Sequence, residues 1–251
     1  MLILPLALLV LAACGQGQRQ SSAAQTSTTK FATAATTKEA AVKPLGADDD
    51  AQISRRLDVL KDYTEDQVPG AKFPEFSPFS ASAGLNTAIT GDPGDYTLYL
   101  STSAQELTPH EAPLALHKAT PTSTAAANEA YAKMGYQSLA GSQPQTLAGA
   151  IKAVVRRDKR ATAVMWLHGK YSVTVRSTAH DLAAAKALAT QVEALLAQNP
   201  LPKTETHGAV VLTVESQQGR TNLVSWREAS AYYKISGHKA MTVLKLAIAI
   251  S

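Results

Sequence analysis

Residues 163–176 read AVMWLHGKYSVTVR, and residues 223–236 read LVSWREASAYYKIS. Each stretch starts with an apolar run that ends in a tryptophan, passes through a short turn, and continues with a second β-rich run. Apolar and polar alternation on both sides of a short turn predicts a β-hairpin. The chain's only tryptophans, Trp166 and Trp226, stand 60 residues apart and hold the same place in the two hairpins.

The flanks of the two hairpins also correspond. Another β-rich run precedes each hairpin, at residues 151–157 and 209–215, and a helical pattern follows each one. The first helix has one apolar face, and Thr178-Ala179-His180-Asp181 before it resembles a capping box. That face consists of Leu182, Ala185, Leu188 or Ala189, Val192 and Leu196; the second helix repeats the spacing with Met241, Leu244 and Ile248.

This pattern predicts an α+β fold, in which antiparallel sheets are backed by helices. Residues 146–251 then form two tandem strand-strand-strand-helix units, unless two common hairpin patterns coincide by chance. The arrangement is similar to C-terminal domains of uncharacterised bacterial envelope lipoproteins. That resemblance implies an architecture and a location, but no catalytic residue.

The pattern of residues 47–145 predicts an N-terminal α+β part of the chain. After Asp48-Asp49-Asp50, the spacing of Ile53, Leu57 and Leu60 indicates an amphipathic helix with an acidic start. The acidic run fits helix capping better than a calcium loop, which needs spaced ligands and a glycine. Strands are expected around Tyr96–Leu100 and Ala115–Lys118, and a second helix at Ala125–Met134 ending before Gly135.

A loop rich in proline and glycine carries Phe73, Phe76 and Phe79. These phenylalanines either pack on the body of the protein or form an exposed aromatic lip for a ligand or a membrane. Together with Trp166 and Trp226, they are the candidate ligand or packing aromatics.

The start of the chain predicts a location. Leu11-Ala12-Ala13-Cys14 follows a short apolar run and resembles the lipobox of bacterial lipoproteins. The resemblance implies a signal peptide at residues 1–13, cleaved between Ala13 and Cys14, and acylation of Cys14 by a diacylglyceryl group and further chains such as palmitate. The alternative is a buried cysteine in an N-terminal helix.

Residues 14–46 are mostly Gln, Ser, Thr and Ala, which predicts a lipidated, disordered tether. We therefore expect a cell-envelope protein anchored to a membrane through Cys14. By the same resemblance, Gly15 favours the outer membrane in a host that has one, and otherwise the anchor lies in the cell membrane.

The remaining composition points away from polyanion chemistry. The formal net charge is +4 and the densest basic stretch, Arg156–Arg160, reads as a solvated turn, with contact to an anionic lipid surface as the alternative. An extracytoplasmic location also makes nucleic acid an unexpected partner.

No catalytic motif stands out in the sequence. There is no G-x-S-x-G elbow, and no histidine pair at metal-ligand spacing, so we expect no enzyme, no metal and no cofactor. His168 and His238 hold matching places near predicted strand ends and form either a shared site or two surface histidines.

Three functions remain open. The leading hypothesis is a noncatalytic, membrane-anchored lipoprotein that binds a protein or a cell-wall component. The alternative is a carrier or sensor of a lipid or another apolar ligand held between the layers. The third is an envelope hydrolase whose catalytic groups come together only in the fold.

Overall fold

The computed structural model of this protein describes residues 48–79, 85–102, 108–139, 144–147, 151–215 and 219–250. For residues 48–53 and 145 it describes the backbone alone. The predicted signal peptide, Cys14 and the tether lie outside the described residues.

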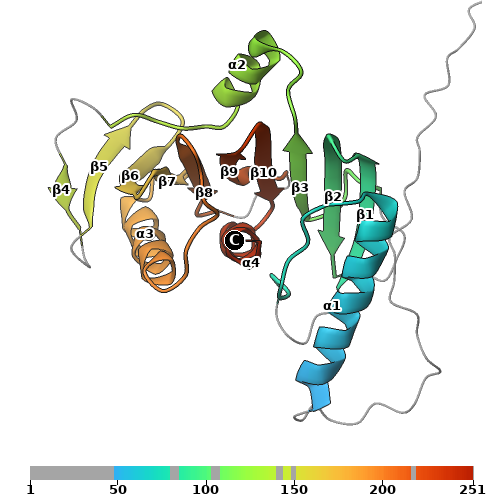
Figure 1. The fold of residues 1–251 in the computed structure, drawn as a ribbon. Coiled ribbons are helices and arrows are strands. Elements are labelled where there is room, and N and C mark those ends of the chain that lie inside the picture. The colour runs from blue at the N-terminus through green and yellow to red at the C-terminus, as the bar shows by residue number, and fades with distance from the viewer. Residues whose placement is uncertain are drawn as a thin grey trace, which may run out of the picture.

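A mixed, mostly antiparallel sheet forms the centre of the molecule (Figure 1), which confirms the α+β class. Its strand order is β1-β2-β3-β10-β9-β8-β7-β6-β5-β4. All neighbours pair antiparallel except β7 and β8, which pair parallel across the α3 crossover. The strands are β1 (Asn86–Asp92), β2 (Asp95–Ser101), β3 (Leu114–Ala119), β4 (Gln145–Thr146), β5 (Lys152–Arg157), β6 (Thr162–His168), β7 (Tyr171–Ser177), β8 (Gly208–Thr213), β9 (Asn222–Glu228) and β10 (Ala231–Gly237).

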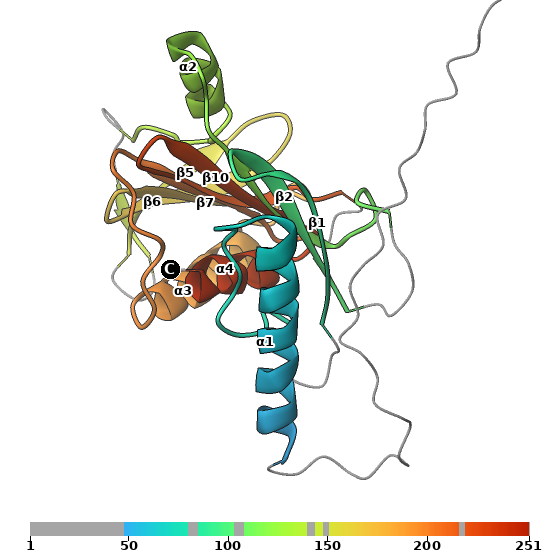
Figure 2. The ribbon, with the colours of Figure 1, turned by 45° about the vertical axis from the view of Figure 1, so that its right-hand side comes forward.

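Helices α1 (Asp48–Gln67), α3 (Leu182–Leu196) and α4 (Ala240–Ala249) lie on one side of the sheet (Figure 2). Helix α3 packs on β6 and β7, α4 on β8 to β10, and α1 on β1. We call this side the helix-covered face. Helix α2 (Thr124–Ala132) lies on the opposite side, which we call the open face.

The helix-covered face holds the main hydrophobic core. Trp166 and Trp226 are only 2% and 0% exposed. The apolar faces expected for α3 and α4 are buried there, with Ala185, Ala189, Val192 and Leu196 from α3 and Leu244 and Ile248 among those from α4. Helical periodicity thus identified the buried faces, because a helix on a sheet buries one stripe of its surface.

The start of α3 corrects one expectation. Asp181, rather than Thr178, is the N-cap, and its side chain accepts a hydrogen bond from the Ala184 amide. Thr178 is engaged elsewhere: its amide and hydroxyl both donate to the carboxylate of Glu215. The β7–α3 connection is therefore held by a distant acidic side chain, which local spacing did not reveal.

The two tryptophan hairpins have the same register. Trp166 pairs with Val173, and Trp226 with Tyr233. Chain order also repeats, because β5, β6, β7 and α3 are followed by β8, β9, β10 and α4.

Strands from both predicted parts of the chain belong to one sheet, because β3 pairs with β10 along six residues, Leu114–Ala119. Helix α1 adds Leu60 to the core, and its arginine Arg56 donates to the Leu85 carbonyl and to Asn86. Within the described ranges, no helix is both long and apolar enough to span a membrane.

Candidate functional site

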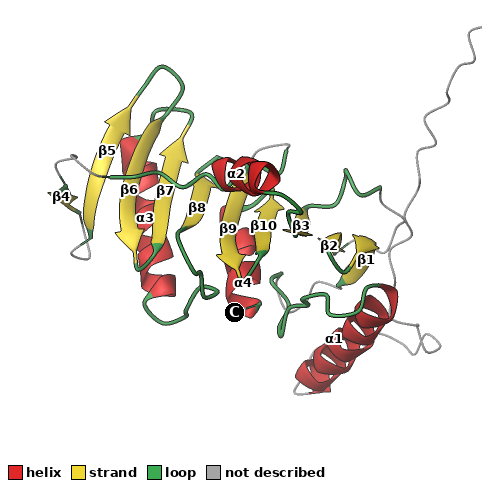
Figure 3. Cartoon of the chain, turned by 45° about the horizontal axis from the view of Figure 1, so that its top comes forward, coloured by secondary structure: helices red, strands yellow, loops and turns green. Residues whose placement is uncertain are grey.

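The open face is crossed by α2 and by the segment that follows it. Figure 3 shows α2 in front of β9 and β10, with residues 133–139 continuing across the sheet toward β5. Ser225 donates its hydroxyl proton to the Met134 carbonyl at 2.5 Å, and the Gln137 amide donates to the Ser172 hydroxyl at 3.0 Å. The crossing segment is therefore fixed to the sheet through small hydroxyl side chains of two separate strands.

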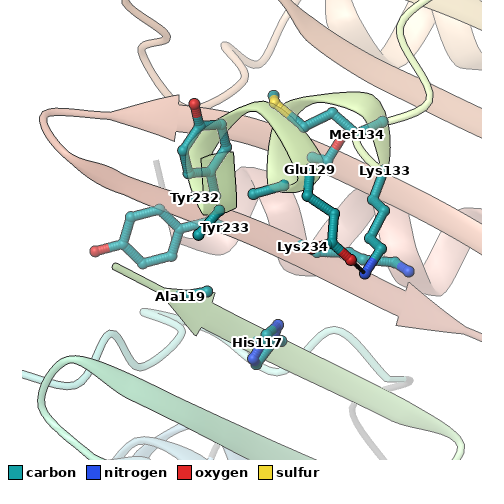
Figure 4. Close-up of a pocket in the computed structure, with 11 residues that line it drawn as sticks. His117, Ala119, Glu129, Lys133, Met134, Tyr232, Tyr233 and Lys234 are labelled. Carbon is teal, nitrogen blue, oxygen red and sulfur yellow. Dashed lines mark hydrogen bonds and ion pairs between the residues drawn. The ribbon is translucent and has the colours of Figure 1, made fainter. Parts of the chain in front are cut away.

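Helix α2 itself makes little contact with the sheet. Its hydroxyl cap is Ser123, which accepts from the Ala126 amide, but none of its residues is buried. A hollow of about 270 Å³ lies between α2 and the strands (Figure 4). Its lining combines alanines 119, 126 and 130 with Met134, the two tyrosines 232 and 233, and the polar side chains of His117, Glu129, Lys133, Ser225 and Lys234.

Small side chains explain this hollow. Ser225, Ala126 and Ala130 reach only a short distance into the space between the helix and the sheet. A helix that presents alanine to a strand leaves room that leucine would fill. On its outer rim, Lys133 and Glu129 form an ion pair of 2.6 Å, drawn as a dashed line in Figure 4.

A second hollow, of about 450 Å³, lies on the same face and shares Lys234 with the first. Its lining comes from β10, from residues 110 and 111, and from the residues that lead into β9. The lining residues are His110, Glu111, Gly219, Arg220, Lys234, Ser236 and His238. The two hollows together form a groove along β10, which we call the β10 groove.

Lys234 is the cation common to both halves of the groove. It is exposed, and the described residues offer its ammonium no hydrogen bond or ion pair. Arg220 is fixed instead: its Nη1 donates to the carbonyls of Pro109 and Ala112 at 2.8 and 3.1 Å. Its guanidinium carbon lies 5.7 Å from the centre of the Tyr99 ring.

Two titratable groups of the second hollow have shifted pKa values. Partial burial, and then the charge of Arg220, lower the pKa of His238, so this imidazole is neutral at pH 7. Hydrogen bonds from the Thr108 amide and hydroxyl lower the pKa of Glu111, which keeps this carboxylate ionised. The hollow thus holds two cations, Arg220 and Lys234, and one anion, Glu111.

The aromatic residues proposed from the sequence lie away from the β10 groove. Trp166 and Trp226 are buried on the helix-covered face. Phe73 and Phe79 pack partly buried against the main core, whereas Phe76 is 44% exposed. The three phenylalanines therefore do not share one environment.

His168 and His238 do not form a shared site. His168 pairs with Tyr171 at the start of β7, while His238 follows the end of β10. Since β7, β8 and β10 point the same way, the two histidines lie at opposite ends of the strands. The repeat does not make them equivalent either, because Glu228 holds in the second hairpin the place that His168 holds in the first.

His168 does meet a carboxylate. Its Nδ1 lies 3.2 Å from Glu193, which also accepts the Trp166 indole N–H at 2.8 Å. A hydrolase of the serine type would need a hydroxyl nucleophile beside this histidine. Among the described residues, no serine or threonine forms a hydrogen bond with His168, and no three metal-ligating side chains converge.

Of the groove residues, the sequence singled out His238 as a candidate site residue, but not Lys234, Arg220 or Ser236. The available signal was the alternation of Tyr232, Lys234 and Ser236 on one face of a strand. Arg220 gave no signal, because its partners Pro109 and Ala112 are more than a hundred residues away. No family model, no curated protein and no solved structure matches this chain.

Proposed function

We propose that this protein is a noncatalytic binding protein of the bacterial envelope, anchored to a membrane through Cys14, which takes up a protein or a cell-wall component in the β10 groove. The unpaired Lys234, common to both halves of that groove, is the observation that carries this proposal. An exposed ammonium on a strand flanked by hollows is a recognition element rather than a part of the core.

The two faces of the sheet differ in their packing, which supports a binding role for the open face. The helix-covered face is filled with large side chains, including two tryptophans that are almost completely buried. On the open face, none of the residues of α2 is buried, and a hollow remains between the helix and the strands. Stability thus comes from one side, and the other side remains available for a partner.

Crosslinking in cells tests this proposal. A photoreactive residue placed at Thr97, next to the groove, is expected to give a discrete adduct. The same residue at exposed Lys203, in the loop after α3, serves as the control. Adducts that are equally diffuse at both positions would contradict specific binding on the open face.

The anchor has a separate test. Cells fed a clickable palmitate analogue are expected to label the protein, and Cys14→Ser is expected to abolish the label and release the protein from membranes. Two or more acyl chains hold a protein stably, whereas one holds it only marginally. Membrane retention of Cys14→Ser without label would contradict the anchor.

We also infer that residues 151–251 contain a duplicated strand-strand-strand-helix unit. The equal registers around Trp166 and Trp226, and the repeated order of elements, support this inference. So does the pairing before each hairpin, in which Val155 faces Val164 and Val210 faces Val224.

A carrier of a small apolar ligand is the second candidate. The alanines and Met134 in the 270 Å³ hollow favour it. Binding pockets for small molecules start at about 300 Å³, so this hollow suits a small ligand or one end of a longer one. Native mass spectrometry before and after organic extraction would reveal an extractable ligand, and a mass that matches the lipidated protein alone would count against the carrier.

A further inference from the structure

The second hollow of the β10 groove lies over Ser236, a small residue of β10. Across β9, β10, β3 and β2, the open face presents Leu223, Ser236, Ala115 and Tyr99 in one row. The serine and the alanine lie between two large side chains, so the surface is depressed over β10 and β3. The strand register thus accounts for this depression.

Arg220 borders this depression in a fixed position. Two backbone carbonyls accept from its Nη1, and the Tyr99 ring lies beside the guanidinium. A guanidinium has five N–H donors, and Arg220 donates to the described residues through Nη1 alone. An arginine held in place before binding loses less side-chain entropy when it takes up an anion.

The other side of the depression supplies a second cation and a hydroxyl. Lys234 and Ser236 are two residues apart on β10, so both side chains point to the open face. Lys234 has no partner among the described side chains. His238 follows at the strand end and adds an imidazole that can donate one N–H.

One carboxylate opposes these cations. Glu111 also lines the hollow, but its Oε2 accepts from the amide and the hydroxyl of Thr108 at 2.9 and 2.8 Å. It partly neutralises the hollow and leaves an excess of one positive charge from Arg220 and Lys234. This excess of positive charge favours an anionic group such as a phosphate.

We propose that this hollow binds a phosphate group, with Arg220 and Lys234 as its charged ligands and Ser236 as a hydroxyl donor. The volume of about 450 Å³ is larger than one phosphate needs, so the group belongs to a larger molecule. That molecule is a lipid headgroup, a wall polymer or a small soluble phosphate ester. The inference rests on the proposed function, because it names the chemistry recognised in the same groove.

Titration of the full chain in micelles of a neutral detergent tests this proposal. The probes are glycerol 3-phosphate and inorganic phosphate, with glycerol as the uncharged control, followed by NMR or calorimetry. We expect saturable binding of glycerol 3-phosphate in the millimolar range, and none of glycerol. Binding is expected to weaken as salt is added, since the attraction is between charges.

Lys234→Met is the decisive variant, because Lys234 supports no other described residue. We expect it to weaken binding at least about tenfold, the effect of losing one charge-assisted hydrogen bond. Arg220→Lys keeps the charge but loses the planar fork, and a comparable loss is expected. Lys203→Met removes an exposed lysine elsewhere and should bind like the wild type.

Unchanged affinity in Lys234→Met would overturn the proposal, as would the absence of saturable phosphate binding. Either result would leave the proposed function standing if the Thr97 crosslink still appeared in cells. Loss of the discrete crosslink with phosphate binding intact would instead refute the proposed function and keep the phosphate site. Vesicles with and without phosphatidylglycerol identify the source: Lys234-dependent binding to the former alone indicates a lipid headgroup.

Discussion

Replacing Glu215 with glutamine should destabilise the protein in a pH-dependent way. The carboxylate of Glu215 accepts hydrogen bonds from the Ser177 hydroxyl at 2.5 Å, from the amide and hydroxyl of Thr178 at 3.0 and 3.1 Å, and from the Ala179 amide at 3.2 Å. It thereby ties the end of β8 to the connection between β7 and α3.

The lowered pKa of Glu215 gives the size of the stability loss expected for Glu215→Gln. Partial burial would raise the pKa of Glu215, but the hydrogen bonds from Ser177, Thr178 and Ala179 outweigh it and lower the pKa from 4.5 to about 2. Such a difference corresponds to about 3 kcal/mol of preference for the ionised form. Because the side chain is partly exposed, we expect Glu215→Gln to lower the free energy of unfolding by on the order of 2 kcal/mol at pH 7.

The sign of the pH dependence follows from the lowered pKa. The stabilisation is fully present above the unfolded-state pKa of 4.5, and it disappears as the pH falls toward about 2. The difference between wild type and Glu215→Gln should therefore be largest at neutral pH and shrink steadily below about pH 4.5.

Urea denaturation followed by tryptophan fluorescence measures this difference, since Trp166 and Trp226 are both buried in the folded state. The melting temperature should fall by about 4–8 °C at pH 7. Glu205→Gln is the control, because Glu205 forms only an exposed ion pair of 3.7 Å with Arg227. Equal stability of Glu215→Gln and wild type at pH 7, or a gap that stays constant down to pH 3, would refute the reasoning.

Three other substitutions probe the packing and the buried polar groups. Gly208→Ala would place a methyl carbon 2.2 Å from the ring of Tyr171. We therefore expect chemical denaturation to show a free energy of unfolding lower by about 1–3 kcal/mol. Gly219→Ala is the control and should be close to neutral, because its nearest neighbour would lie 3.9 Å away. Asn222→Ala removes buried hydrogen bonds that join β8, β9 and the end of β10, and should lower the unfolding free energy by about 2–4 kcal/mol. Thr162→Val removes a buried hydroxyl that has no hydrogen-bond partner among the described residues. The free energy of unfolding should stay unchanged or rise by about 1 kcal/mol. A large loss would show that the hydroxyl is hydrogen-bonded in solution.

Local pattern was sufficient for most of the secondary structure. Alternation predicted the hairpins around Trp166 and Trp226, and helical spacing predicted the buried stripes of α3 and α4. These features follow from the period of the backbone, which is two in strands and 3.6 in helices. The start of α3 was misplaced: Asp181 is the N-cap, and Thr178 instead donates to Glu215, which follows the end of β8.

The sequence by itself determined most of the segments that become strands and helices, and the apolar sides of α3 and α4; β1 and β4 were not predicted. Only the tertiary structure decided that β3 pairs with β10, that β7 and β8 run parallel, and that α2 lies on the face opposite α3 and α4. The β10 groove belongs to this second group, since Arg220 meets the Pro109 carbonyl across more than a hundred residues. Local periodicity depends on neighbouring residues. Strand pairing and side-chain contacts depend instead on how distant segments bury their apolar faces together. A short window of sequence therefore does not specify which strands pair.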